Sequence, residues 1–361
     1  MALKPTSGFA LVQHGVNDAR MFLIRHAYSA WAPETDQLED GYTVLLPTPA
    51  DLPVFFDLAM EVLSHQNKAL LREIVVIPDW PSPSFEAYLK ERCRSYEGMP
   101  VRTVSLKSID KWAWRLTKSI TTRHFTQLLR GIDALRTSHA IIHDCDLFLP
   151  PGNFLLEQYL TCTQEGLSVY GLDVRRSLAR TDREEFVATW EMTFSTKWFR
   201  SFPPYQHKGQ MAVVNGIRQE FDTTLLPQYL SRAESIGWRD RSNEYFHFNY
   251  VIASFRNFMT GRGYVPAYSL KLFLIRTLVD AFDRTGWTYR GLPEQSEFLA
   301  GMHGLRELVA DNALGKTTLV EFAKKLGGLA ASGVFSAEKS RFITERGREL
   351  YSSIGAPPGL I

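Results

Sequence analysis

The sequence predicts an α/β fold in which a mixed, mainly parallel sheet is flanked by helices and followed by a C-terminal helical extension. Two observations carry this prediction. Between residues 41 and 146, short apolar runs alternate with segments of helical periodicity, which is the pattern of βαβ units. From residue 306 to the end, the pattern is mostly helical and mildly basic.

Each element of the sheet is predicted by a short run rich in Val, Ile and Leu. Such runs predict strands at 42–46, 73–77, 101–105 and 140–142. Apolar residues at helical spacing between them predict helices at 53–65, 82–96 and 121–135. A later helix is expected over 244–258, and before residue 40 one strand-like run is expected over 21–24.

The composition excludes several classes of protein. The chain has 361 residues, of which 45% are hydrophobic and 22% charged, so it is globular rather than disordered. A formal net charge of +2 gives no strong field for nucleic acid. Three cysteines without a CxxC pair argue against a structural zinc site and a disulfide scaffold. With no targeting segment and no apolar run of membrane-spanning length, a cytoplasmic protein without a transmembrane segment is expected.

The sharpest motif follows the last predicted strand. Asp144 and Asp146 flank Cys145, and because side chains alternate along an extended segment, the two carboxylates point the same way. Ligands of open α/β sheets bind at the carboxyl ends of the strands. Neighbouring carboxylates repel each other unless a cation compensates them, and Mg²⁺ or Mn²⁺ takes such oxygen ligands together with phosphate oxygens.

Asp144-Cys145-Asp146, at the end of this βαβαβαβ stretch and followed by Leu-Phe-Leu-Pro-Pro, resembles the DxD motif of GT-A-type glycosyltransferases. The resemblance covers residues 41–305 and implies a GT-A-type, Rossmann-like domain. It divides the chain into a flanking segment 1–40, a catalytic domain 41–305 and the extension 306–361. Within the domain, 41–150 would be the nucleotide-sugar half and 151–305 the acceptor half.

The same resemblance implies the activity. The expected protein is a metal-dependent glycosyltransferase that moves a sugar from a UDP- or GDP-sugar to a hydroxyl of a glycan or another acceptor. Asp144 and Asp146 would hold Mn²⁺ or Mg²⁺ on the donor diphosphate. His303, flanked by glycines in Ala300-Gly-Met-His-Gly304, is the expected third ligand. Its alternative reading is a helix-start histidine without a ligand.

Further donor contacts are expected at the ends of the first two strands. Pro47 and Thr48 end the first strand, where the family's backbone contacts the base and ribose. Asp79, after the second strand, matches an acidic position that often holds the base or ribose. Arg123 and Lys118 are the cations considered for the diphosphate. The alternative readings are an ordinary proline-terminated strand, a turn aspartate and solvated surface charges.

The acceptor side is predicted from the segment that begins Asp240-Arg-Ser-Asn-Glu244. Its resemblance to a helix start in inverting GT-A enzymes makes Glu244 the first candidate for the catalytic base and Asp240 the second. The family's paired Glu-Asp is here Glu-Tyr. If the reaction retains configuration, such a base is not required. Slight basicity near the C-terminus leaves an anionic acceptor or peripheral membrane contact open.

Two alternatives of other classes remain. Phe22-Leu-Ile-Arg-His-Ala resembles the signature of histidine phosphatases, in which His26 would be the phosphorylated nucleophile. The spacing of about 277 residues to His303 is too long for that compact domain. The other alternative is a non-catalytic module of the same fold that binds a nucleotide-sugar without turnover.

Overall fold

The computed structural model describes most of the chain, namely residues 19–33, 37–96, 98–117, 119–172, 174–176, 185–214, 216–240, 244–283, 286–287, 289–310 and 314–355. Its centre is a seven-stranded sheet of order β12-β6-β9-β4-β1-β2-β3. The strands are β1 (Glu39–Thr48), β2 (Leu71–Pro78), β3 (Val101–Thr103), β4 (Thr137–His143), β6 (Val169–Gly171), β9 (Glu191–Ser195) and β12 (Ile236–Trp238).

The sheet is mixed and mainly parallel, as predicted. Strand β1 lies parallel to β2 and β4, β2 lies parallel to β3, and β6 lies parallel to β12. Strand β9 runs antiparallel to both of its neighbours, β4 and β6. Because β1, β2 and β4 are parallel, their carboxyl ends meet at one edge of the sheet, where a ligand site is expected.

Three two-stranded ribbons lie outside this sheet. They are β5 (Leu147–Phe148) with β13 (Phe246–His247), β7 (Val174–Arg176) with β8 (Glu185–Val187), and β10 (Gln210–Val214) with β11 (Ile217–Phe221). All three pairs are antiparallel. The β5–β13 ribbon joins segments that lie far apart in the chain and directly follows Asp144-Cys145-Asp146.

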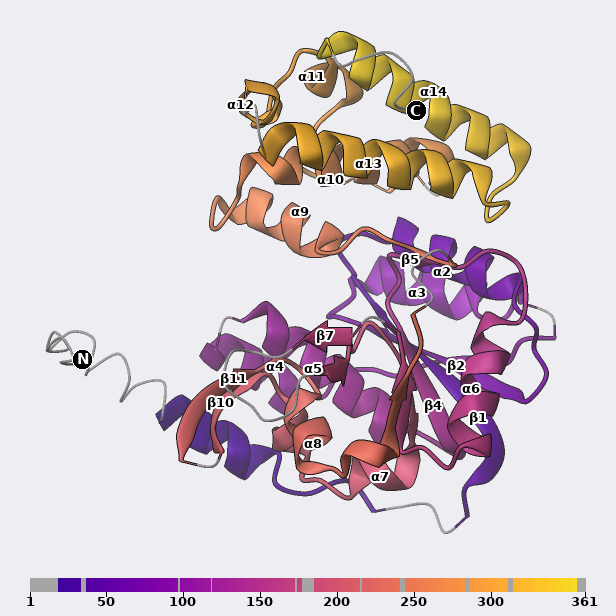
Figure 1. Cartoon of the computed structure of the whole chain (residues 1–361), viewed down its shortest axis with the longest axis vertical. Helices are drawn as coiled ribbons and strands as arrows, with labels where there is room; N and C mark the ends of the chain where they lie inside the picture. The colour runs from indigo at the N-terminus through magenta and orange to yellow at the C-terminus, as the bar shows by residue number, and fades with distance from the viewer. Residues whose placement is uncertain are drawn as a thin grey trace, which may run out of the picture.

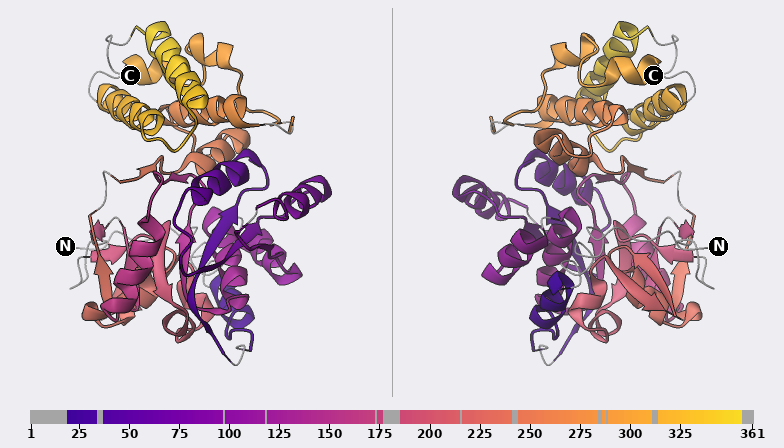
Figure 2. Two further views of the ribbon diagram at one scale, coloured as in Figure 1. Left: turned by 90° about the vertical axis from the view of Figure 1, so that its right-hand side faces the viewer. Right: turned by 90° about the vertical axis from the view of Figure 1, so that its left-hand side faces the viewer.

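The helices cover both faces of the sheet and form a layer at one end of the molecule (Figure 1). Those of the main domain are α2 (Val54–Ser64), α3 (Pro83–Arg92), α4 (Ser108–Thr117), α5 (Ile120–Asp133), α6 (Phe154–Gln164), α7 (Thr196–Arg200) and α8 (Leu225–Leu230). The end layer holds α9 (Val251–Thr260), α10 (Ser269–Phe282), α11 (Gln295–Leu299), α12 (Leu305–Ala310), α13 (Leu314–Ala331) and α14 (Ala337–Ser353). Figure 2 shows this layer as a separate mass above the sheet in both side views. Helices α12, α13 and α14 confirm that the C-terminal part is helical, but the layer begins at α9, within the segment expected to be the acceptor half.

Alternating side chains of the buried strands pack into two hydrophobic cores, one on each face of the sheet. Val44 and Leu46 of β1 belong to the larger core, which extends through α2 into the end layer. Leu45, on the opposite face, packs with Leu128 and Ile132 of α5 in the second core. Helix α5 approaches the sheet closely at Gly131, where a Cβ atom would lie 3.1 Å from Leu45 Cδ2. This contact brings the amino-terminal half of α5 to the carboxyl edge of the sheet.

Two expected elements differ in the structure. Residues 19–27 are helical, not extended, because Ile24 and Tyr28 share one helix face and pack on Phe125 of α5. The helix expected over 244–258 begins only at Val251. Residues 246–247 pair with β5 instead, and Tyr250 has a left-handed φ of 66°, which interrupts a regular helix. Among the described helices, none combines the length and apolar character needed to cross a lipid bilayer.

Candidate active site

Asp144 and Asp146 lie directly after the buried strand β4, at the carboxyl edge of the sheet. The Asp144 backbone N–H donates to the Trp190 carbonyl at 2.9 Å, which ties the motif to the segment before β9. The Asp144 carbonyl in turn accepts from the Leu147 N–H at 3.0 Å, which closes a turn over the motif. The Asp146 side chain is buried with 5% exposure. The strand and the turn thus hold two carboxylates in a place from which most water is excluded.

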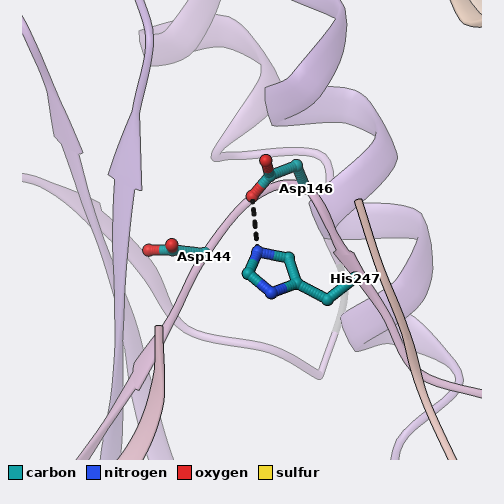
Figure 3. A group of neighbouring side chains, drawn as sticks. All are labelled: Asp144, Asp146 and His247. Atoms are coloured by element: carbon teal, nitrogen blue, oxygen red, sulfur yellow. Dashed lines mark ion pairs between the residues drawn. The ribbon is translucent and has the colours of Figure 1, made fainter. Parts of the chain in front are cut away.

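A histidine from a distant part of the chain completes the group. His247 lies on β13, which pairs with β5 so that His247 stands opposite Leu147. Its Nε2 lies 3.5 Å from Asp146 Oδ1 (Figure 3). One ligand atom from each of Asp144, Asp146 and His247 lies within 4.8 Å of the others. The Trp190 ring, 4.5 Å from the imidazole, packs against it and limits its orientation.

The negative charge of these two aspartates favours the binding of a cation. Burial, with the nearby charges of Asp146 and Glu191, raises the pKa of Asp144 well above its usual range. Burial also disfavours the Asp146 carboxylate, but the hydrogen bond and charge of His247 outweigh it and lower the pKa of Asp146. Among the described residues, no lysine, arginine or histidine forms an ion pair with Asp144.

These residues fit a divalent cation. His247 Nδ1 is buried and has no hydrogen-bond partner among the described residues, so the packing of Trp190, and not a hydrogen bond at Nδ1, limits the orientation of the ring. Two carboxylates and a neutral imidazole are ligands that Mn²⁺ accepts, and Mg²⁺ accepts the carboxylates more readily than the imidazole. A dication would also relieve the repulsion between the two aspartates.

The group lies in a cavity of about 440 Å³ that extends to both sides of it. On the side of β1 and β2, the lining includes Pro47, Asp79 and Arg256. On the side of β9, it includes Thr189 and Asp222. Because β4 lies between β9 and β1 in the sheet, the metal group separates these two halves of the cavity.

In the β1–β2 half, Asp79 is already engaged by other protein groups. Its Oδ2 accepts from Arg256 at 2.6 Å and from Arg123 at 3.3 Å, and its Oδ1 accepts from the Ala50 N–H at 2.7 Å. Arg256 also makes a bidentate pair with Asp51 at 2.7 and 2.8 Å. Burial disfavours the Arg256 charge, but Asp79 and Asp51 outweigh burial and raise its pKa. These ion pairs tie α9 to the ends of β1 and β2.

The remaining donor-side predictions lie close to the same network. Pro47 lines the cavity, whereas Thr48 is fully buried and its hydroxyl donates to the Leu46 carbonyl at 3.1 Å. The Thr48 carbonyl accepts from Gln127 of α5 at 3.2 Å. The Arg123 guanidinium lies beside the paired Trp80 and Trp114 rings, 5.1 and 4.9 Å from their centroids. Lys118 lies outside the described residues.

The half of the cavity beside β9 contains polar groups that the sequence analysis did not single out. Asp222 follows β11, and its Oδ1 accepts from the Thr223 N–H at 2.8 Å. The Thr189 hydroxyl donates to the Thr223 carbonyl at 2.6 Å, which joins this loop to the segment before β9. His124 of α5 also lines the cavity, and burial lowers its pKa, so its imidazole is neutral near pH 7. This half therefore offers a carboxylate and a neutral imidazole.

Three predicted residues are not brought to the metal group. The His303 Nε2 lies 3.1 Å from Glu297 Oε1, and the His303 ring packs on Phe258 and Phe298 beside α11 and α12. Glu244 and Asp240, both in the described part of the chain, are not among the residues that line the cavity. Glu244 precedes β13, not a helix, and Asp240 is exposed.

The nucleophile of the histidine-phosphatase alternative, His26, also lies away from the metal group. His26 is exposed on the helix formed by residues 19–27 and does not line the cavity. A phosphorylated histidine nucleophile needs a pocket around the phosphoryl group. Its surroundings give the phosphatase reading no support.

The sequence contains no local signal that singles out His247. The histidine lies three residues after Glu244, in the segment that was expected to begin the acceptor helix. Arg256 lies further along the same segment. Nothing local separates these residues from surface residues of a helix. Their role depends on the pairing of β13 with β5 and on the packing of α9.

No known family model matches this sequence, and no curated protein does. The fold is similar to solved structures at low identity. A mannosyltransferase of Pyrobaculum calidifontis in complex with GDP-Man and Mn²⁺ has a TM-score of 0.39 at 10% identity, over 95% of each chain. Residues 1–349 of S. aureus TarS, in complex with UDP-GlcNAc, have a TM-score of 0.34 at 10% identity, over 87% of this chain and 90% of that one.

The galactosyltransferase LgtC, in complex with donor and acceptor sugar analogues, has a TM-score of 0.36 at 12% identity. That alignment covers 46% of this chain and 62% of LgtC, so the match spans less than two thirds of LgtC. The solved structures thus include sugar transferases, the class that the sequence resembles.

Proposed function

We propose that the protein is a metal-dependent glycosyltransferase that uses a nucleotide-sugar donor. The observation that carries the proposal is the group of Asp144, Asp146 and His247, whose ligand atoms lie within 4.8 Å of one another inside a cavity. Asp146 and His247 are buried, and Asp144 is half-buried. The cavity lies at the carboxyl edge of a mainly parallel sheet, where nucleotides bind in α/β folds. The mannosyltransferase, TarS and LgtC structures are complexes with GDP-Man, UDP-GlcNAc or sugar analogues, and we propose the same class of ligand for this chain.

The residues would divide the work as follows. Asp144, Asp146 and His247 would hold Mn²⁺ or Mg²⁺, which as a Lewis acid neutralises negative charge on the departing nucleoside diphosphate. Arg256, fixed by Asp51 and Asp79, would shape the β1–β2 half for the nucleoside. In that arrangement Asp79 acts by orienting Arg256 rather than by contacting the base. Lys271 of α10, whose charge acts on Asp146, adds positive potential on the side of the end layer.

For the acceptor we propose Asp222 as the base, ahead of the predicted Glu244 and Asp240. Four aspartates line the cavity, of which Asp144 and Asp146 belong to the metal group and Asp79 is held by two arginines. Asp222 lies in the other half. It would take the proton of the acceptor hydroxyl while that oxygen bonds to the anomeric carbon and the bond from this carbon to the diphosphate breaks. The anomeric configuration would invert.

The donor site is tested by thermal unfolding with UDP- and GDP-sugars, each with and without Mn²⁺. A ligand at about 100 times its dissociation constant should stabilise the native protein by about 2.7 kcal/mol. The shift should require Mn²⁺ and disappear in Asp146→Asn. Asp40→Asn, which removes an exposed carboxylate at the start of β1, is the matched control and should keep the shift. If no nucleotide-sugar shifts the transition, the transferase proposal is wrong.

The base is tested once a donor and an acceptor are known. Asp222→Asn should lower kcat by roughly a hundredfold or more, because general base catalysis typically contributes that much. Glu244→Gln and Asp240→Asn should change kcat much less. If Glu244→Gln lowers kcat strongly and Asp222→Asn does not, the catalytic base is Glu244, as the sequence predicted, and Asp222 is not the base. A product of retained configuration would remove the need for either.

A further inference from the structure

The third metal ligand is carried by a very short ribbon. His247 of β13 stands opposite Leu147 of β5, and Phe246 stands opposite Phe148. Asp146 directly precedes β5, so the position of His247 relative to Asp146 depends on this pairing. A two-stranded ribbon of two residues per strand is not stable by itself in water. Other parts of the chain must therefore hold it.

Helix α13 of the end layer makes direct contact with this ribbon. The Lys325 Nζ donates a hydrogen bond to the His247 carbonyl at 3.1 Å. At Gly328, one helical turn further on, a Cβ atom would lie only 2.6 Å from Phe246 Cε1, so the ring packs on the bare helix backbone. Two consecutive ribbon residues are thus held by two positions on one face of α13.

Aromatic contacts extend the same support. Phe248, next to His247, packs on Phe322 of α13 with ring centroids 5.9 Å apart. Phe148 of β5 packs on Phe335, which lies between α13 and α14, at 5.7 Å. Both strands of the ribbon are therefore packed against the C-terminal extension. The side chain of His247 points toward Asp146 (Figure 3).

We propose that α13 is a functional part of the metal site, in which Lys325 and Gly328 position His247 as a ligand. This inference rests on the proposed metal site. It assigns a role to the extension, which the sequence analysis treated only as a helical addition. The two residues act through the backbone of His247 and the ring of Phe246. They are positioning residues, and their substitution should weaken metal binding without removing any ligand.

The test measures the Mn²⁺ dissociation constant of the full-length protein from the electron paramagnetic resonance of free Mn²⁺. Gly328→Leu should weaken binding by about tenfold or more, as substitutions that disturb ligand orientation commonly do. Gly327→Leu is the matched control, because a Cβ atom at Gly327 meets nothing within 4 Å. It places the same side chain on the same helix and should bind Mn²⁺ as the wild type does.

A second pair of variants covers the case in which Gly328→Leu does not fold. Lys325→Met removes the donor to the His247 carbonyl and should also weaken Mn²⁺ binding several-fold. Lys325→Arg keeps a donor and should restore most of the affinity. Lys324→Met, at the exposed neighbouring lysine, should have no effect. The melting temperature of each metal-free variant shows whether the fold is intact.

The outcomes separate this inference from the proposed function. If the wild type does not bind Mn²⁺, the proposed metal site is wrong, and so is the proposed role of α13. If the wild type binds Mn²⁺ and both Gly328→Leu and Lys325→Met bind it equally well, only the role of α13 is wrong. A lowered melting temperature with unchanged Mn²⁺ affinity would likewise reduce Lys325 and Gly328 to a structural role.

Discussion

Two pairs of aspartates lie in and beside the same cavity and have opposite surroundings. Asp51 and Asp79, after β1 and β2, are bound by the guanidinium of Arg256, and Asp79 also by that of Arg123. Among the described residues, the ion pairs of Asp144 and Asp146, after β4, are limited to the contact of Asp146 with the His247 ring. The first pair is neutralised within the protein. The second is left with negative charge that an external cation can balance.

The comparison teaches that the function of an acidic pair is decided by the cations that the fold brings to it. Buried carboxylates are costly unless they are paired. Where arginines supply the pairing, the result is a structural junction between α9 and the sheet. Burial raises the pKa of Asp79 despite its arginines, and it raises the pKa of Asp144 well above its usual range. At Asp144, which no arginine among the described residues pairs with, a bound metal ion would supply the missing positive charge. Substitutions at the two pairs should therefore have different consequences.

The largest expected effect is on activity at the second pair. Asp146→Asn should lower kcat/KM for sugar transfer by about a thousandfold, equivalent to about 4 kcal/mol, because the leaving diphosphate loses its charge stabilisation. Asp51→Asn, at the first pair, should lower it by less than about tenfold. Steady-state kinetics at saturating Mn²⁺ measure both. Equal losses of kcat/KM in the two variants would show that the two pairs do not differ in function.

The next effect is on stability at the first pair. Arg256→Met leaves buried Asp79 with Arg123 as its remaining ion-pair partner among the described residues, so the free energy of unfolding should fall by about 3 kcal/mol. Urea denaturation measures the change, and Arg262→Met, at an exposed arginine just beyond α9, is the control. A loss below about 1 kcal/mol would mean that the ion pairs at Asp79 contribute no more than surface pairs do.

The pH dependence of the metal-free protein should reveal the charge at Asp144. Its pKa is raised in the folded state, so the native protein binds more protons than the unfolded chain. Stability from this group is therefore present at low pH and is lost as the pH rises through the folded-state pKa, by at most about 1.4 kcal/mol per pH unit. Asp144→Asn should remove this slope. Chemical denaturation in EDTA from pH 5 to 8 compares the two, and parallel curves would contradict the raised pKa.

The smallest effect is expected at Arg123. Its guanidinium lies 3.3 Å from Asp79, which keeps its shorter contact with Arg256 when Arg123 is replaced. Arg123→Met should lower the free energy of unfolding by about 1 kcal/mol, in part through lost stacking on Trp80 and Trp114. A double-mutant cycle with Arg256→Met measures the coupling between the two arginines. Strict additivity would show that they do not share Asp79.

The sequence predicted the parts of this architecture that local patterns determine. The runs at 42–46, 73–77 and 140–142 are strands β1, β2 and β4 because they are buried on both faces and need no distant partner to be recognised. The place of Asp144 and Asp146 at the carboxyl edge of the sheet could be predicted for the same reason, since it depends only on the strand before them. The run at 21–24 was misassigned because four apolar residues fit either a strand or a helix.

The site residues from the second half of the chain could not be predicted from local sequence patterns. His247 reaches Asp146 only through the pairing of β13 with β5, and Arg256 reaches Asp79 only through the packing of α9. His303 looked suitable because its glycine neighbours permit a close backbone approach, yet its ring packs between Phe258 and Phe298. A single sequence carries no information on which of several histidines a distant segment will present to a site.

The pairing of β5 with β13 has a consequence for how the chain reaches its native state. An ion bound by both Asp146 and His247 would act as a cross-link that closes a loop of about 100 residues, whose closure carries a large entropic penalty. Contacts of such long range form late in folding. The ion should accordingly slow unfolding more than it speeds folding. The bound metal would therefore lengthen the lifetime of the native structure.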